Sequence, residues 1–158
     1  MATLAQISQN LQLLRNKESF YEEVLRIASR FEAYLVDLNQ IQLSGGKNIL
    51  GETIGGYSEA AERIAETENT RKPKIQGETY NFEWTGQLFD GMYLRATSEY
   101  IEIFSTAPHA TIVSETYSNL FGENVIFGLT EEHLIEFVQK KLMPEVRRYV
   151  CRTMNLAA

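Results

Sequence analysis

Apolar residues recur at helical spacing close to the start of this chain of 158 residues. Between Ser8 and Leu38, an apolar stripe that begins at Leu11 continues with members three, four and seven residues apart. The stripe predicts one long helix, or two helices joined between Asn16 and Ser19, because "SFYE" from Ser19 has the spacing of a capping box. A helix with one apolar face has to bury that face, so we expect it to pack on a sheet.

The pattern changes to a period of two residues in the second half of the chain. "LFDGMYLRA" (Leu88 to Ala96) predicts a strand in which Gly91 marks a bulge or a close backbone approach. "YIEIFS" (Tyr100 to Ser105) predicts a second strand, and the short "TSE" link favours an antiparallel hairpin. Apolar residues at 112–113 and 125–127 predict further pieces of strand.

A helix is predicted near the carboxyl terminus, with Thr130 in the place of its cap. Glu131 and Glu132 fall in its first turn, where carboxylates favour the positive end of the helix dipole. Its apolar residues continue to Leu142, and Pro144 is expected to kink or restart the helix. The order helix, loop, antiparallel strands, helix predicts an α+β fold in a single domain over residues 1–158. We expect the long amino-terminal helix and the carboxyl-terminal helix to pack on a small antiparallel sheet.

A long polar connection, from Ser44 to Asn81, separates the first helical pattern from the strands. Paired glycines at 45–46 and 55–56 favour loop structure, and Ser58 is expected to cap a short helix that ends near Ala65. The remainder is polar and locally basic, at Arg71, Lys72 and Lys74. Connections of this length are usually functional or disordered.

Composition and charge narrow the possible functions. Hydrophobic residues make up 44% of the chain and charged residues 23%, which is ordinary for a globular domain. The net charge of -6 argues against tight binding of bare nucleic acid, because phosphate contacts need clustered Lys and Arg. Cys151 is the only cysteine, so no internal disulfide is expected. There is no signal-peptide pattern and no apolar run near the ~20 residues that span a bilayer, so we expect a protein made in the cytoplasm with no membrane partner.

Candidates for chemistry are few. A nucleophile needs a base within reach, and the two histidines are His109, in a polar loop, and His133, in the first turn of the last helix. Neither "HATIVSE" nor the surroundings of His133 match a nucleophile elbow or an H-E-x-x-H metal site. We therefore expect no catalytic residue, no metal site and no cofactor. A small hydrolase that uses His109 or His133 with nearby carboxylates stays open as an alternative.

Four segments, taken in order, resemble a known family. They are "GGYSEAAERI" (Gly55 to Ile64), "TGQLFDGM" (Thr85 to Met92), "YSNLFGE" (Tyr117 to Glu123) and "IFGLTEEHLIEFVQKKL" (Ile126 to Leu142). Their order and spacing resemble the tail-completion and head–tail joining proteins, or neck proteins, of tailed bacteriophages. Members of that family look like a long amino-terminal helix, a Thr-Gly-x-Leu turn into a strand, a segment ending in Phe-Gly, and a capped carboxyl-terminal helix.

The resemblance implies a geometric function with no reaction. Copies of the protein are expected to close into a ring in the virion, between the head connector and the tail-tube protein, and to leave a channel through which DNA passes. The connection from Ser44 to Asn81 is then an arm that neighbouring subunits order. Interface residues are expected in this arm and in the resembling segments: Tyr57, Arg71, Lys72, Lys74, Trp84, Tyr117 and Phe121.

The Thr-Gly turn has a structural role in this interpretation. Gly86 is expected to adopt a backbone conformation that side chains resist and to launch the first strand. Trp84 is expected either to pack over the sheet or to anchor a neighbouring subunit. A monomeric regulatory binding module encoded by a mobile element is the remaining alternative, and it predicts a monomer that never enters phage particles.

Overall fold

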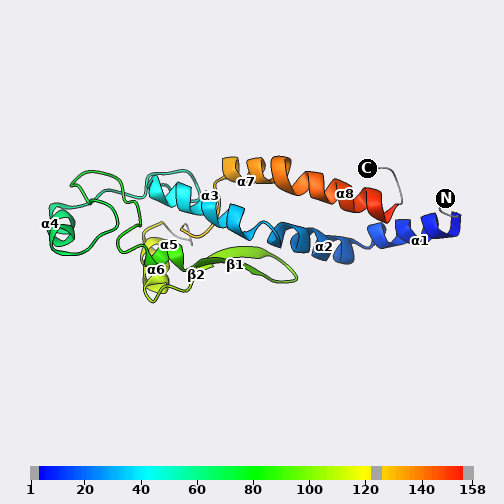
Figure 1. Cartoon of the computed structure of the whole chain (residues 1–158), viewed down its shortest axis with the longest axis horizontal. Helices are drawn as coiled ribbons and strands as arrows, with labels where there is room; N and C mark the ends of the chain where they lie inside the picture. Colours follow the sequence, from blue (N-terminus) through cyan, green and yellow to red (C-terminus); the bar gives the residue numbers. More distant parts are fainter. Residues whose placement is uncertain (1–3, 122–125, 155–158) are drawn as a thin grey trace.

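The amino-terminal part of the chain is a series of three helices. A computed structural model describes residues 4–121 and 126–154, with the backbone alone for residues 4–7, 13 and 121. The helices are α1 (Leu4–Arg15), α2 (Lys17–Ser29) and α3 (Glu32–Ser44), and they follow one another along the molecule (Figure 1). The predicted join between Asn16 and Ser19 is confirmed, because α1 ends at Arg15 and α2 begins at Lys17. No single long helix forms, and a second break, which was not predicted, separates α2 from α3.

Each break between these helices has a local cause. Asn16 caps α2, since its side-chain oxygen accepts a hydrogen bond from the Ser19 amide at 3.4 Å. Ser19 consequently lies inside α2, and the predicted capping box does not form. The second break falls at Phe31, whose backbone leaves the helical region (φ -99°, ψ 25°) before α3 begins.

The predicted hairpin is confirmed, but its first strand is shorter than expected. β1 (Met92–Ala96) pairs antiparallel with β2 (Ile101–Ser105), with Leu94 opposite Ile103. The segment before it, Gln87–Asp90, forms the helical turn α5 instead of strand. Gly86 takes a φ of 88°, as predicted, but it launches this turn. Gly91 makes the predicted close approach, because a Cβ there would lie 3.0 Å from the Ala107 amide nitrogen.

No strand forms at 112–113, where α6 (Ala110–Phe121) is a helix. Ala110, Val113 and Tyr117 have helical spacing and pack on the core, and this burial outweighs the strand preference of the β-branched residues. Of the other predicted piece of strand, Val125 lies outside the described residues, and residues 126–127 form a bend.

The carboxyl-terminal helix begins and is interrupted where the sequence predicts. Thr130 caps α7 (Glu131–Phe137), and its hydroxyl accepts a hydrogen bond from the His133 amide at 3.3 Å. A π-helical segment, η1 (Val138–Leu142), then leads into α8 (Met143–Thr153). Pro144 lies in the first turn of α8, where its missing N–H breaks no helical bond, and the widened turn before it accommodates the ring.

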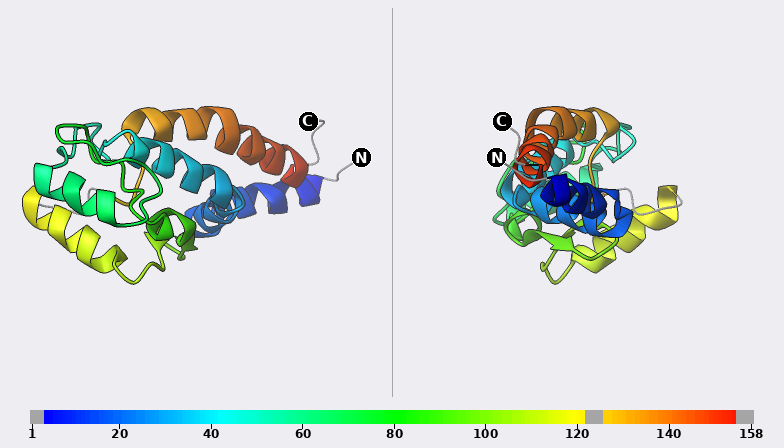
Figure 2. Two further views of the ribbon diagram at one scale, coloured as in Figure 1. Left: turned by 60° about the vertical axis from the view of Figure 1, so that its left-hand side comes forward. Right: turned by 90° about the vertical axis from the view of Figure 1, so that its right-hand side faces the viewer.

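The elements form three layers, and α2 and α3 make up the middle one. The hairpin packs on one side of these helices, and α7, η1 and α8 run along the other side, with α8 beside α2 (Figures 1 and 2). The centre of the core includes Leu43 and Ile126, both 0% exposed, together with Leu88, Ile103 and Phe137. This architecture is the predicted α+β fold. Within the described ranges, no helix combines the length and apolarity needed to cross a bilayer.

Candidate functional site

The connection from Ser44 to Asn81 is held against its own chain. Backbone bridges join Lys47 to Thr53 and Gly56 to Thr79. The Tyr57 amide donates to the Glu78 carbonyl at 2.9 Å. Its helix, α4 (Glu59–Thr67), starts where predicted, with the Ser58 hydroxyl accepting from the Ala61 amide at 3.2 Å. Contacts within one chain therefore hold this segment in place.

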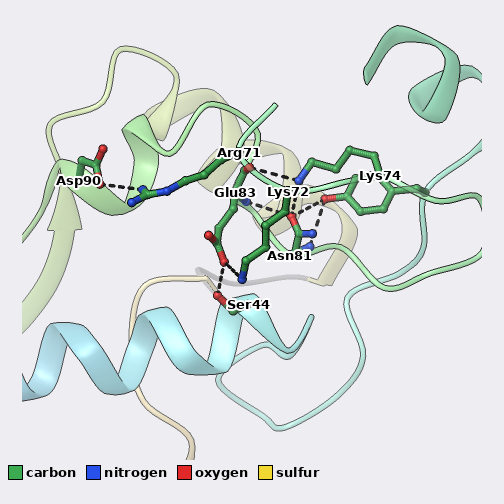
Figure 3. Close-up of polar contacts among 8 residues, drawn as sticks. Ser44, Arg71, Lys72, Lys74, Asn81, Glu83 and Asp90 are labelled. Atoms are coloured by element: carbon green, nitrogen blue, oxygen red, sulfur yellow. Dashed lines mark hydrogen bonds and ion pairs between the residues drawn. The ribbon is translucent and has the colours of Figure 1, made fainter. Parts of the chain in front are cut away.

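The basic residues of this connection make ion pairs within the chain. Arg71 reaches across Gly86 to Asp90, with 2.9 Å between Nη1 and Oδ1 (Figure 3). The Lys72 ammonium and the Ser44 hydroxyl both donate to Oε1 of Glu83, which is 7% exposed. Burial raises the pKa of the Glu83 carboxyl, but the two hydrogen bonds and the positive charges of Lys72 and Arg71 together outweigh burial, and the pKa is lowered. Arg71 and Lys72 thus stabilise the fold as well as presenting charge.

Lys74 is buried, contrary to the expectation of an exposed arm residue. Only 3% of it is exposed, and its ammonium donates to the side chain of Asn81 and to the Glu83 carbonyl (Figure 3). The ammonium lies 5.4 Å from the ring centroid of Tyr57 and 5.9 Å from that of Trp84. Burial lowers the pKa of Lys74, and the nearby Glu83 carboxylate opposes this effect. A covered ammonium of this kind cannot contact the acidic surface of a neighbour.

An apolar hollow, here called the aromatic pocket, lies beside Lys74. It has a volume of about 240 Å³ and is open to solvent. Its lining comes from α4, the segment 80–84, α5 and α6: Tyr57, Ala61, Tyr80, Phe82, Trp84, Leu88, His109, Val113 and Tyr117. The ring centroids of Tyr57 and Tyr80 lie 4.9 Å apart, edge to face, and those of Phe82 and Tyr117 lie 5.3 Å apart. Such contacts give the pocket fixed walls.

Two residues of the pocket combine an apolar ring with a polar group. The Trp84 indole N–H donates to the Glu68 carboxylate, and its half-buried ring faces the pocket, so Trp84 does not pack over the sheet. Burial raises the pKa of Tyr117 from 10.0 to about 12, so its hydroxyl, already neutral at physiological pH, stays neutral to a more alkaline pH than that of a free tyrosine. The pocket therefore presents uncharged aromatic surface.

The structure brings four of the seven predicted interface residues together. The aromatic pocket is lined by Tyr57, Trp84 and Tyr117. The Lys74 ammonium lies beside it, 5.4 Å from the ring centroid of Tyr57. Arg71 and Lys72 lie in the neighbouring polar cluster. Phe121 ends α6, and its side chain lies outside what the structure describes.

Sequence reasoning missed Tyr80 and Phe82. In "YNFEW" the aromatic residues alternate with Asn81 and Glu83, so the aromatic side chains share one face and the polar side chains share the other. This alternation was a usable signal. In the structure the aromatic face forms a wall of the pocket and the polar face binds Lys72 and Lys74.

The two histidines lie in different environments. His109 precedes α6 and lines the aromatic pocket among uncharged side chains. His133 lies in the first turn of α7, and its Nδ1 is buried without a hydrogen-bond partner among the described atoms. Across the described residues, no group of three or more His, Cys, Asp or Glu is placed to hold a metal ion.

No family model, no curated protein and no solved structure matches this chain to a significant degree. The arrangement of its own residues is therefore the basis for assigning a function.

Proposed function

We propose that the protein is a structural virion protein of a tailed bacteriophage. Copies of it form a ring at the head–tail junction, join the connector to the tail and leave a channel for DNA. In this proposal the protein has no catalytic residue, and its partners are further copies of itself and the adjacent connector and tail-tube proteins.

The convergence of the resembling segments on the aromatic pocket carries the proposal. Tyr57 comes from the first segment, Leu88 from the Thr-Gly segment and Tyr117 from the third, and all three side chains line the same hollow. Segments that pack only for stability fill the space between them. Here they leave an open apolar hollow of about 240 Å³, which suits an apolar side chain of a partner.

Exposed apolar residues elsewhere also support an assembly role. Large apolar side chains that are at least 60% exposed occur on α3, on the turn after it and on α6: Ile41, Leu50, Ile112 and Leu120. Leu50 is presented by a turn in which the buried Asn48 side chain accepts hydrogen bonds from the Leu50 and Glu52 amides, each at 2.9 Å. Apolar side chains distributed over several faces are expected in a subunit that has neighbours on more than one side.

The test is the mass of the purified protein in solution, measured by light scattering over a range of concentrations. Ala61 lines the aromatic pocket, whereas Ala60, beside it on α4, is exposed and does not. Wild-type protein and Ala60→Trp are expected to form a multi-subunit species, and Ala61→Trp, which fills the pocket, is expected to shift toward monomer. Circular dichroism checks that both variants fold. A wild-type monomer at every concentration, both alone and mixed with a candidate tail-tube protein, would contradict the ring. Identical masses for the two variants would exclude the pocket from the interface.

A further inference from the structure

Two helices of this protein carry the same charged motif, Glu-x-x-Arg-x-x-x-Arg. In α2 it consists of Glu23, Arg26 and Arg30, and in α8 of Glu145, Arg148 and Arg152. Residues three, four and seven positions apart share one face of a helix. Each helix therefore carries one carboxylate and two guanidinium groups along a single face.

The two charged faces meet. α8 lies beside α2 (Figures 1 and 2), and the ring centroids of Phe20 and Tyr149 are 6.3 Å apart across the contact. All six residues of the two motifs line one hollow of about 170 Å³, here called the arginine hollow. Within the lining, four arginines face two glutamates, in a chain whose net charge is -6.

Each glutamate is already neutralised by the arginine three residues further on. Arg26 binds Glu23 through two hydrogen bonds, at 2.7 and 2.6 Å, and Arg148 binds Glu145. Arg30 and Arg152 form no ion pair within 4.0 Å among the described residues, and both are exposed. Two guanidinium groups of the hollow are thus accessible from solvent and have no ion-pair partner within 4.0 Å among the described residues, although the Glu23 carboxylate, which Arg26 binds, also attracts Arg30.

The helix dipole explains only part of this arrangement. An arginine near the carboxyl-terminal end of a helix is favoured, and Arg30 and Arg152 both have such a position. However, like charges four residues apart repel each other, and each helix places a second arginine at that spacing. The dipole also gives no reason for both faces to point into the same hollow. A bound anion removes the repulsion and accounts for both features.

We infer that the arginine hollow binds a phosphate group. Guanidinium groups bind phosphate oxygens through paired, planar hydrogen bonds, and Arg30 and Arg152 are the two that are available for this. The phosphate is either free inorganic phosphate or part of a DNA backbone, and both present the same oxygens. The inference does not depend on ring formation.

The experiment uses the full chain and two probes, inorganic phosphate and a short fluorescent DNA duplex. Phosphate binding is followed by the rise in unfolding temperature relative to sodium chloride at equal ionic strength, and duplex binding by anisotropy. The double variant Arg30→Gln/Arg152→Gln is compared with the single variant Arg147→Gln. Arg147 is an exposed arginine on the same helix that does not line the arginine hollow.

Wild-type protein and Arg147→Gln are expected to bind phosphate similarly, and the double variant is expected to bind about tenfold more weakly or not at all. Arg30→Lys/Arg152→Lys should recover only part of the binding, because lysine keeps the charge but loses the planar fork. Duplex binding with the same dependence on Arg30 and Arg152 identifies the DNA backbone as the source. Phosphate binding without duplex binding identifies the free ion.

Unchanged binding in the double variant, or no binding of either probe to the wild-type protein, would overturn the inference. The mass of the double variant is measured alongside. Loss of phosphate binding in a variant that still assembles would show that this site and the proposed ring are independent properties.

Discussion

The two ends of this molecule are stabilised by different means. At one end, the connection after α3, the aromatic pocket and α6 enclose the buried polar residues Lys74 and Glu83, which the half-buried Asn81 side chain links through hydrogen bonds. At the other end, neither η1 nor α8 contributes a fully buried residue, and the ion pair between Arg148 and Glu145 within α8 is partly exposed. We call these regions the aromatic end and the helical end.

This difference indicates which end of the molecule holds one fixed arrangement and which end can change its contacts. Buried polar contacts fix one arrangement, because each unpaired group would be costly. Exposed ion pairs contribute little to the free energy of unfolding, so a partner can replace them at low cost. In the proposed assembly, the aromatic end would therefore be the preformed part of the binding surface, and the helical end would be the part that adjusts to a partner.

The largest expected effect is that of Lys74→Ala at the aromatic end. Loss of the buried stem and of the ammonium leaves a cavity and removes two hydrogen bonds, so the free energy of unfolding should fall by about 2–4 kcal/mol. Lys140→Ala at the helical end removes an ammonium that is paired with Glu136 at 2.9 Å on the surface. It should cause little measurable change in urea unfolding. Equal losses in the two variants would refute the contrast between the ends.

The next effect concerns alkaline pH. Because burial raises the pKa of Tyr117 to about 12, the unfolded chain loses this proton before the folded protein does. The stabilisation is complete below pH ~10 and is lost as the pH rises toward ~12, with a total of at most ~2 kcal/mol. Tyr117→Phe should remove this part of the pH dependence. Tyr100→Phe, at an exposed tyrosine of the hairpin turn, should leave the dependence as it is in the wild-type protein.

A smaller effect is expected at acidic pH. The pKa of Glu83 is lowered below its ordinary value of 4.5, so its stabilisation is present above that pH and is lost as the pH falls further. Glu83→Gln should cost about 1 kcal/mol at neutral pH and flatten the acid side of the stability curve. Unfolding of the variant at several pH values tests this. A curve parallel to that of the wild-type protein below pH 4.5 would contradict the assigned role of the Lys72 and Ser44 hydrogen bonds.

The smallest effect is expected at the joint between α1 and α2. Asn16→Ala removes the cap of α2 and should cost about 0.5–1 kcal/mol. Hydrogen exchange should become faster at the first amides of α2 and stay unchanged around the aromatic pocket. Faster exchange at both ends would mean that the two regions are coupled more tightly than we propose.

Local signals in the sequence predicted much of this fold. The caps Ser58 and Thr130, the antiparallel hairpin around its short turn and the interruption at Pro144 all depend on residues within a few positions of each other. For the same reason, the Thr-Gly turn correctly predicted the left-handed conformation of Gly86.

The remaining features depend on contacts between distant residues. Leu88 was predicted in a strand, but it and its neighbour Phe89 are both buried in the helical turn α5, and the strand begins only after Gly91, which packs closely against Ala107. Lys74 was predicted as an interface residue of the arm, and its burial could not be read from the sequence, because lysine is rarely buried without partners. Its partners, Asn81 and the Glu83 carbonyl, reach it only when the connection folds back on itself. The aromatic pocket likewise exists only where α4 and α6 meet.

Electron microscopy of the purified full-length protein, alone and mixed with a candidate tail-tube protein, tests the central claim, that copies of this chain assemble around a channel. We predict closed rings with a central opening, in which the aromatic pocket of each subunit is covered by its neighbour. Particles of monomer size under every condition, with no ring in either sample, would contradict it.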